Sequence, residues 1–503
     1  MAELPDLTAC DREPIHIPGS IQPHGALLVV DATTQAILQV SENIGDIIGI
    51  DVETVLDAPL HEVIDFPGSL FGAERPAHSA WMPVDFPHAR KTKAWHAAVH
   101  AYETRWLIEI EPRETSFDDD PARVAHELAL RLEHDPNAER AGARIARTIR
   151  SLLGYDRVMV YRFDRDWHGE IIAEARRDDL EGYLGMHYPA TDIPAQARAL
   201  YLRNRVRQIS DCKYVPARIL PAYDPVTAEA TDLSDVSLRS VSPVHLEYLG
   251  NMGVTASLVA SIIVDGTLWG LISCHHYSPF FTDHRMREAA DAIARAFAAR
   301  VAAIEELAEI EVESTLLTVR EKLITAFNES DRIDPDLLAR LAPELLDVVD
   351  ADGVAIFAGD RVVRHGQVPD EVALRRIRDA ATGQGKNRDS VLHTDRIGAW
   401  DEELADPSIA ELAAGVIFMP LWPDSWDAVM WTRAEQVRQV RWGGNPSLAK
   451  LETIPGARLS PRQSFEAWQE TVRGRSRPWS RLHIASAREL GELIERSTRG
   501  TGP

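Results

Sequence analysis

The chain has 503 residues, with 54 basic and 78 acidic side chains and a formal net charge of −24. One hydrophobic core rarely grows beyond about 250–300 residues, so this length predicts roughly three domains. The negative charge repels nucleic-acid phosphates and anionic lipids, so neither nucleic acid nor a membrane is an expected partner. Three cysteines, a polar N-terminus and no apolar stretch of ~20 residues predict a cytoplasmic protein without a disulfide framework.

The N-terminal part predicts an irregular arm followed by an antiparallel sheet. Residues 1–24 contain few periodic apolar positions. From residue 26 two short apolar runs, ALLVV and AILQV, flank a turn, and residues 95–101 and 106–110 alternate apolar with other side chains. Alternation of this kind is typical of a half-buried antiparallel sheet.

A second unit is predicted after the acidic linker candidate at 117–121. Its expected elements are a helix over 121–152, strands over 156–163 and 169–176, and a hairpin over 256–274. In the hairpin, Asp265 and Gly266 separate two β-rich runs. Both residue types tolerate positive φ, which a type I′ turn requires.

A long helix is expected over residues 284–328, because this segment contains no internal proline or glycine. Its apolar residues step by 4, 3, 4 and 4 along a narrow stripe formed by Val312, Leu316, Val319, Leu323 and Phe327. The stripe either packs against the helix's own domain or forms the seam of a homodimer, and we favour the dimer because the stripe would otherwise face water.

The third unit partly repeats the second, which indicates two related α/β sensor domains in tandem. ADGVAIFAG echoes the earlier strand DRVMVYRF, and AGVIFMPLW with DAVMWTRAE echoes the 256–274 hairpin. Between that second hairpin and a final helix predicted at 488–497 lies an irregular segment, 436–476, which contains WGGNP and LSPRQSF. A long irregular excursion in a compact domain is usually functional or disordered.

Three candidate chemical groups are weak when each is taken alone. Cys10 lies in the polar arm near Arg12, which favours the nucleophilic thiolate. Asp192 precedes Ile-Pro and a helix-forming run, where the simplest role is a helix N-cap. Cys274, His275 and His276 are consecutive strand residues that point to alternate faces, so no metal site is expected there.

Five motifs taken together are far more specific. CDREPIHIPGSIQPHG, PATDIPAQARALYLRNRVR, SPVHLEYLGNMG, LWGLISCHH and PRQSF follow one another along nearly the whole chain. In this order and at this spacing they resemble the bacteriophytochromes. The resemblance implies a mixed α+β fold of three tandem domains with central antiparallel sheets, joined by the long helix: PAS at 1–117, GAF at 118–310 and PHY at 311–503. It also implies an arm knotted through a GAF loop, residues 212–242, near Ile21.

By the same resemblance the cofactor is biliverdin IXα, an open-chain tetrapyrrole with two carboxylates, joined by a thioether to Cys10. The implied partners of the carboxylates are Tyr201, Arg207, Arg239, Ser242 and Ser257. The implied neighbours of the pyrrole rings are Met159, Tyr161, Tyr188, Asp192, Ile193, Pro194, His245, Tyr248 and His275. Two positions depart from the pattern: Val259 stands where some relatives have serine, and Tyr188 where relatives often have phenylalanine.

The resemblance implies a red/far-red photoreceptor rather than an enzyme. Light isomerises the C15–C16 bond of the cofactor, and a tongue at 436–476 reads the change. Arg462 pairs with Asp192 in one state, Ser464 replaces it in the other, and Trp442 belongs to the same tongue switch. The long helix and the GAF domain would form a homodimer, and the output module, a histidine kinase in many relatives, is expected to lie outside this chain.

Two other functions are compatible with single features of the sequence. Tandem GAF domains could sense a cyclic nucleotide or haem, in which case Cys10 is dispensable. A hydrolase could use Cys10 or Cys274 with a histidine, although neither cysteine has the local sequence around a papain-like nucleophile. The absorption spectrum after mixing with biliverdin separates all three functions.

Overall fold

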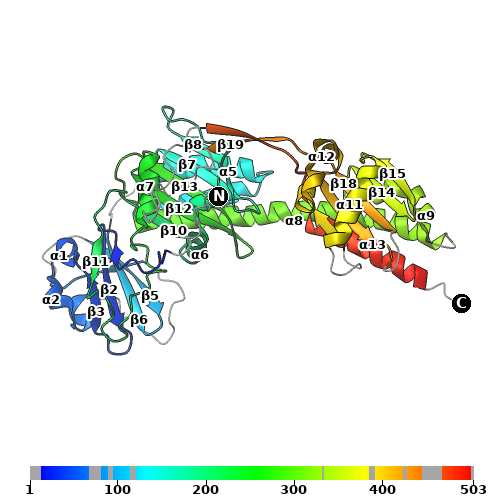
Figure 1. The fold of residues 1–503 in the computed structure, drawn as a ribbon. Coiled ribbons are helices and arrows are strands. Elements are labelled where there is room, and N and C mark those ends of the chain that lie inside the picture. The colour runs from blue at the N-terminus through cyan, green and yellow to red at the C-terminus, as the bar shows by residue number, and fades with distance from the viewer. Residues whose placement is uncertain are drawn as a thin grey trace, which may run out of the picture. The chain divides into compact units, whose positions relative to one another are not determined.

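The computed structural model describes residues 13–66, 81–88, 94–113, 120–330, 333–384, 391–422, 427–444 and 467–499. The chain forms two compact units (Figure 1), one of Met1–Ile304 with Arg441–Trp468 and one of Glu305–Val440 with Gln469–Pro503. No helix in the described part is both long enough and apolar enough to cross a membrane. No group of three or more His, Cys, Asp or Glu side chains among the described residues could hold a metal ion.

The first sheet of unit 1 has seven strands in the order β1-β11-β3-β2-β6-β5-β4. Its elements in chain order are β1 (Ser20–Ile21), β2 (Ala26–Asp31), β3 (Ile37–Ser41), α1 (Ile44–Ile47), α2 (Val52–Val55), α3 (Leu60–Val63), β4 (Met82–Val84), β5 (Trp95–Tyr102) and β6 (Arg105–Pro112). The two predicted strand pairs are confirmed, since β2 pairs with β3 and β5 with β6, all antiparallel. β11 (Ala217–Leu220) comes from far along the chain and was not predicted in this sheet.

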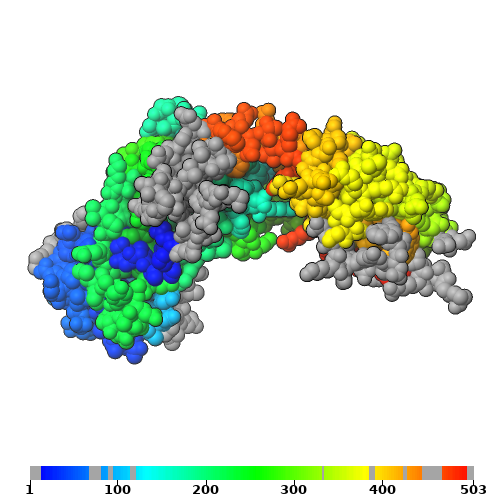
Figure 2. Space-filling view, viewed as in Figure 1, coloured from blue at the N-terminus to red at the C-terminus, as the bar shows by residue number. Residues whose placement is uncertain are grey.

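The N-terminal arm is hydrogen-bonded to the segment that contains β11. β1 pairs antiparallel with β11, so that Ile21 lies opposite Ala217. Across the arm, the Gln22 amide donates to the Leu238 carbonyl at 2.7 Å and the Leu233 amide to the His16 carbonyl at 2.8 Å. Figure 2 shows the arm, in dark blue, against green residues of this later segment. The knot itself stays a prediction.

The second sheet of unit 1 has the strand order β10-β12-β13-β7-β8-β9-β19-β20. The further elements are α4 (Pro121–Leu132), α5 (Ala138–Leu153), β7 (Arg157–Phe163), β8 (Gly169–Arg176), β9 (Met186–Tyr188), a 3-10 turn (Ala190–Asp192), α6 (Ala195–Arg203), β10 (Val206–Ile209), α7 (Pro243–Asn251), β12 (Ala256–Val264), β13 (Thr267–His276) and α8 (His284–Asn328). The hairpin, the strands and the long helix are therefore confirmed. Asp265 and Gly266 have φ of 49° and 76°, as a type I′ turn requires.

The helix predicted over 121–152 is wrong in its middle, because it is two helices. Pro136 cannot donate an amide hydrogen and disfavours helical backbone at Asp135. The chain restarts at Asn137, whose side chain caps α5 by accepting from the Arg140 amide at 2.9 Å. The Asp135 carboxylate pairs with Arg144 at 2.8 Å and stabilises the break.

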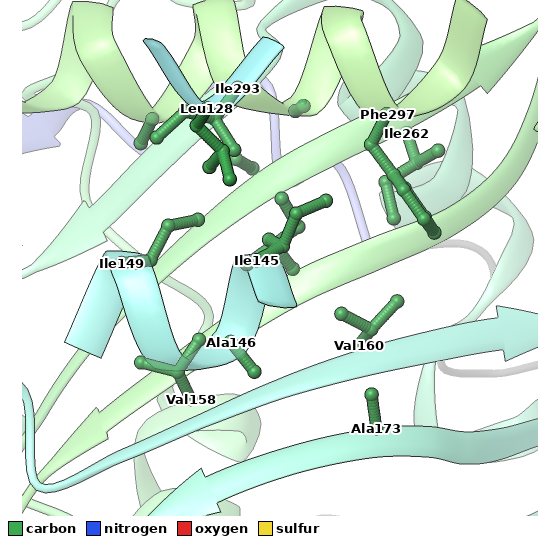
Figure 3. Close-up of a cluster of buried hydrophobic side chains, with 14 of the residues drawn as sticks. Leu128, Ile145, Ala146, Ile149, Val158, Val160, Ala173, Ile262, Ile293 and Phe297 are labelled. Atoms are coloured by element: carbon green, nitrogen blue, oxygen red, sulfur yellow. The ribbon is translucent and has the colours of Figure 1, made fainter. Parts of the chain in front are cut away.

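Alternate residues of β7 face opposite sides of this sheet, and this decides where a ligand can bind. Val158 and Val160 pack with α4, α5 and α8 in the main core. Figure 3 shows Ile145 and Ile149 of α5 and Ile293 and Phe297 of α8 among these side chains. Met159 and Tyr161, one residue out of phase, join a separate cluster on the other face. One face is thus a closed core, and the other is available for a pocket.

Unit 2 is built on a five-stranded sheet in the order β15-β14-β18-β17-β16. The remaining elements in chain order are α9 (Pro335–Arg340), α10 (Ala342–Asp347), β14 (Gly353–Ala358), β15 (Arg361–Gly366), α11 (Glu371–Gln384), β16 (Leu392–Thr394), 3-10 turns at Ile397–Ala399 and Glu402–Ala405, α12 (Pro407–Ala413), β17 (Gly415–Pro420), β18 (Ala428–Arg433), β19 (Arg438–Gly443), β20 (Ala467–Val472) and α13 (Arg481–Arg499). Of these, β19 and β20 belong to the second sheet of unit 1. The predicted β17–β18 hairpin is confirmed. The final helix begins at Arg481 rather than 488, because Ser480 accepts a capping hydrogen bond from the His483 amide at 3.1 Å.

The apolar stripe on α8 divides between two roles. Val319, Leu323 and Phe327 are buried in the core of unit 2, with α9, α10, α13 and one face of the sheet. Val312 and Leu316 are only half-buried. The last three residues of the stripe therefore pack against their own domain, and these three cannot serve as the dimer seam.

Candidate functional site

A pocket lies on the free face of the second sheet and continues under α6 and α7. It has two adjoining parts that share Asp192, Tyr201, His245, Tyr248 and Ser257. Every predicted site residue within the described ranges and outside the tongue lines one or both parts: Met159, Tyr161, Tyr188, Asp192, Ile193, Pro194, Tyr201, Arg207, Arg239, Ser242, His245, Tyr248, Ser257 and His275. Residues spread over more than a hundred positions of sequence thus surround one cavity.

One end of the pocket carries two arginines that have no carboxylate partner among the described residues. Arg239 is buried, and its Nε and Nη1 have no hydrogen-bond partner in the described part of the protein. Arg207 donates to backbone carbonyls, including those of Ser237 and Ser240, both at 3.3 Å. Burial, reinforced by the nearby Arg207, lowers the pKa of Arg239 to about 9. A buried cation left without an anion is costly, so this end of the pocket suits a negatively charged ligand.

Two hydroxyl groups and a phenol lie beside the arginines. Ser257 is buried on β12, and Ser242 stands at the N-terminus of α7. Burial raises the pKa of Tyr201, so its hydroxyl keeps its proton and can donate. Together these groups add neutral hydroxyls beside the two cations.

The histidines of the pocket are held neutral. Burial, followed by the charge of Arg207, lowers the pKa of His245 to about 4. Burial, with the charges of Arg157 and His245, lowers the pKa of His275 to about 3. The Nδ1 atom of the buried His275 has no partner among the described residues. Each imidazole can therefore both donate and accept a hydrogen bond at neutral pH.

Asp192 is not a helix N-cap, so the simplest sequence reading of this residue is wrong. It ends the 3-10 turn, and Pro194 is the residue that precedes α6, with no side-chain cap. The Tyr248 hydroxyl donates to the Asp192 carboxylate at 3.0 Å. The turn therefore presents both a carboxylate and backbone groups to the pocket.

The other end of the pocket is an aromatic and thioether cage. Met159, Tyr161 and Tyr188 are buried there, and the two tyrosine rings lie 6.2 Å apart. A Cβ at Gly169 would come within 1.6 Å of the Tyr161 ring, so only glycine leaves room for that tyrosine. These side chains offer aromatic and thioether surface to a ligand.

Sequence reasoning missed two features of the site. The Ser242 hydroxyl donates to the Glu13 carboxylate at 2.8 Å, and Glu13 with Ile15 lines the pocket. Tyr183 also lines the cage, with the Arg157 guanidinium 3.8 Å from the centre of its ring. Glu13 lies inside the first quoted motif, which was the only sequence signal for it.

The tongue residues are described only in part. Cys10, Arg462 and Ser464 lie outside the described residues. Trp442 is buried, and β19 pairs in parallel with β9 so that Trp442 lies opposite His187. A Cβ at Gly443 would lie 2.7 Å from the Tyr188 ring, so the backbone of β19 passes directly over the cage.

Family models define the class of this protein. A PAS fold matches residues 10–113, a GAF domain residues 137–303 and the phytochrome region residues 316–501. The chain is 54% identical to a bacteriophytochrome of Xanthomonas campestris, over 97% of this chain and 78% of that protein. It is 36% identical to a bacteriophytochrome of Pseudomonas aeruginosa, over 96% of this chain and 66% of that protein.

Solved structures agree with the sequence comparisons. A crystal structure of a bacteriophytochrome from the photosynthetic bacterium R. palustris matches 99% of this chain and 100% of its own, at a TM-score of 0.83 and 32% identity. The photosensory core module of a Stigmatella aurantiaca phytochrome matches 97% of this chain and 98% of its own, also at 0.83, with 33% identity. The chain therefore belongs to the phytochrome family of photoreceptors and has the PAS–GAF–PHY fold of a bacteriophytochrome photosensory core.

Proposed function

We propose that this protein senses red and far-red light through biliverdin IXα joined by a thioether to Cys10. The observation that carries the proposal is the pair of arginines in the pocket, which have no carboxylate partner in the described part of the chain, opposite an aromatic cage. Biliverdin has two carboxylates at one side and conjugated rings at the other, which matches this division. When bound, it supplies absorption of visible light and a C15–C16 double bond that can isomerise.

The carboxylate end of biliverdin needs positive charge and hydrogen-bond donors, and the pocket offers both. Arg207 and Arg239 would each pair with a carboxylate. Nε and Nη1 of Arg239, which no described residue bonds, are available for such a pair. Tyr201 and Ser257 would donate neutral hydrogen bonds beside them, and Ser242 would do so by turning its hydroxyl away from the Glu13 carboxylate. Val259 offers no hydroxyl, so one carboxylate has a contact fewer than in relatives with serine at this position.

The ring end of biliverdin needs hydrogen-bond acceptors for its N–H groups and space in which its terminal ring can rotate. The backbone carbonyl of Asp192 would accept from the pyrrole N–H groups, with Ile193 and Pro194 shaping the turn beside them. His245, held neutral, would lie beside the central rings, and His275 would donate to the carbonyl of the terminal ring. Met159, Tyr161, Tyr188 and Tyr248 would surround the terminal ring with aromatic and thioether surface, against which a ring can turn in place.

Attachment requires that Cys10 reach the pocket. Cys10 is three residues from Glu13, whose carboxylate is bonded to Ser242 at the pocket. Three residues of extended chain span at most about 10 Å, so the thiol can reach the pocket from this anchor. The S–H bond would add across a vinyl double bond: a C–S bond forms, the π bond is lost, and the proton moves to the second vinyl carbon.

Signalling would pass from the pocket to the tongue and then along α8. In this scheme an Arg462–Asp192 pair holds the tongue in one state and Ser464 takes the place of Arg462 in the other, while the tongue changes its secondary structure and Trp442 its packing. The long helix α8 contributes to the cores of both units, which gives the change a continuous path.

The first experiment mixes purified protein with biliverdin. We expect a red-absorbing band that light converts reversibly, and zinc-induced fluorescence of the protein band on a denaturing gel. Cys10→Ser should remove the gel fluorescence, with Cys212→Ser as the matched control because Cys212 bonds the Val254 carbonyl away from the pocket. Fluorescence retained in the Cys10 variant would show that attachment lies elsewhere. The absence of any visible band in the parent would reject biliverdin as the cofactor.

A further inference from the structure

His168 lies just outside the pocket and bonds to the turn that carries Asp192. Its Nδ1 accepts a hydrogen bond from the Ala190 amide at 3.1 Å. Ala190 begins the 3-10 turn that ends at Asp192. Because Nδ1 accepts, it carries no proton, and the remaining ring proton of the neutral imidazole is on Nε2.

The same imidazole packs against the first strand of the tongue. The rings of His168 and Trp442 are 5.4 Å apart and nearly perpendicular, at 83°. His187 contacts the same indole from β9, with the ring centres 5.9 Å apart. Edge-to-face aromatic pairs are favourable at these separations. One side chain therefore touches both the tongue and the turn, although it does not line the pocket itself.

The loop that carries His168 is held by hydrogen bonds to one side chain. The Asp164 carboxylate accepts from the amides of Asp166 at 2.9 Å and His168 at 2.8 Å, and Trp167 between them has φ of 63°. A bulky residue in the left-handed region is uncommon and persists only where its surroundings enforce it.

A second contact from this loop reaches the other end of the turn. The Arg198 guanidinium lies 4.5 Å from the centre of the Trp167 ring and donates to the Ile193 carbonyl at 2.5 Å. Residues 164–168 therefore hold the 190–193 turn at both ends: His168 bonds its first amide, and Trp167 supports the arginine that bonds its last carbonyl. The loop forms an outer clamp on the turn.

We propose that His168 is a positioning residue that couples Trp442 of the tongue to the turn bearing Asp192. A change at the turn shifts the Ala190 amide, the imidazole follows its hydrogen bond, and the ring contact with Trp442 changes. The route is separate from the Arg462–Asp192 pair, and the inference rests on the proposed photoreceptor function.

Two variants separate the hydrogen bond from the ring contact. His168→Phe keeps a ring against Trp442 but removes the acceptor. His168→Asn keeps an acceptor, because its Oδ1 is as many bonds from the backbone as Nδ1, but removes the ring. His187→Phe is the matched control, since it keeps the second ring contact and leaves the acceptor of Ala190 untouched.

The hydrogen bond is tested without any cofactor, by amide hydrogen exchange at Ala190. Loss of one hydrogen bond should speed exchange roughly two- to tenfold in His168→Phe. His168→Asn and His187→Phe should exchange like the parent. Equal exchange in His168→Phe and the parent would overturn the link between His168 and the turn.

The coupling is tested with biliverdin bound. Both His168 variants should bind biliverdin as the parent does, because His168 does not line the pocket. Both should change the dark reversion rate roughly two- to tenfold, because His168→Phe removes the hydrogen bond to the turn and His168→Asn removes the ring contact with Trp442. Parent-like reversion in both variants, with a parent that photoconverts, would reject the coupling alone. A parent that does not photoconvert would instead reject the photoreceptor function.

Discussion

A single residue of the pocket can lower the stability of the ligand-free protein and yet strengthen ligand binding. Arg239 is the clearest case. Its guanidinium is buried beside Arg207, two of its donor nitrogens are unpartnered among the described residues, and its pKa falls to about 9. The folded protein therefore bears a free-energy cost that an anionic ligand would offset.

Arg239→Met should weaken biliverdin binding while leaving the ligand-free protein as stable as the parent or more stable. Loss of charge-assisted hydrogen bonds predicts about 10- to 100-fold lower affinity. Spectroscopic titration and thermal unfolding measure the two effects. Arg203→Met, which removes an exposed guanidinium paired with Asp235, is the control and should leave the affinity unchanged. Parent-like affinity in Arg239→Met would contradict its role as a carboxylate partner.

The buried His275 gives the ligand-free protein a pH-dependent stability. Burial lowers its pKa to about 3 in the folded state, against about 6.5 when unfolded. As the pH falls below 6.5 the unfolded state takes up a proton that the folded state does not, so the free energy of unfolding decreases, by up to about 1.4 kcal/mol per pH unit for this group.

His275→Gln should make this loss of stability shallower between pH 6 and 4.5. Urea unfolding at several pH values measures the slope. The loss should not vanish, because burial also lowers the pKa of His96 and His284. His134→Gln, on the surface, is the control. An unchanged slope in His275→Gln would mean that His275 is already protonated in the folded state.

At the scale of elements, one arginine of unit 2 bonds segments that are distant in sequence: β18, residues 349–350 and residues 478–479. Arg433 of β18 is 2% exposed and lies 3.9 Å from the centre of the Trp479 ring. It donates to the backbone carbonyls of Val349 at 2.8 Å, Asp350 at 3.0 Å and Pro478 at 2.8 Å. This arrangement holds the chain between β20 and α13 against the sheet.

Arg433→Met should lower the free energy of unfolding of unit 2 by about 1–3 kcal/mol, because it leaves buried carbonyls without donors. Arg477→Met, which removes a partly exposed ion pair with Asp350, should cost less than about 1 kcal/mol. Chemical denaturation monitored by tryptophan fluorescence compares the two. Equal stability of both variants would show that the hydrogen bonds of Arg433 do not hold the segment.

At the scale of the whole molecule, homodimerisation through α8 and the GAF domain stays a prediction. The buried half of the apolar stripe serves unit 2, but Leu307 and Ile310 are 60% and 53% exposed on the same helix. Apolar side chains that face water along a helix favour association with a second copy.

A double variant, Leu307→Glu with Ile310→Glu, should convert a dimeric parent into a monomer at micromolar concentration. Sedimentation velocity measures the mass, and Val372→Glu on α11, at another exposed position, should leave the dimer intact. A parent that sediments as a monomer, or a double variant that stays dimeric, would contradict an interface on this part of α8.

Local sequence patterns predicted those helices and strands that are determined by interactions between residues close in sequence. The Asp265-Gly266 hairpin and α8 came from turn chemistry and from the absence of helix breakers, and both lie where expected. The break at Asp135–Asn137 was missed, although Pro136 signals it, because the helical periodicity on both sides suggested one helix. The pocket residues were predicted from motif resemblance, since no local rule brings Arg239 and His275 to one cavity.

The sequence by itself determined the family, most of the sheets and helices, and part of the set of side chains that line the pocket, since Glu13 and Tyr183 were missed. Tertiary structure alone decided that β11 joins the first sheet, that Glu13 bonds Ser242, and that His168 accepts from Ala190. These contacts join residues 22 to more than 200 positions apart, and they form only when folding has buried the surfaces that bring them together. Local propensity describes each segment with its neighbours, whereas pairing between distant segments depends on the packing of the whole core.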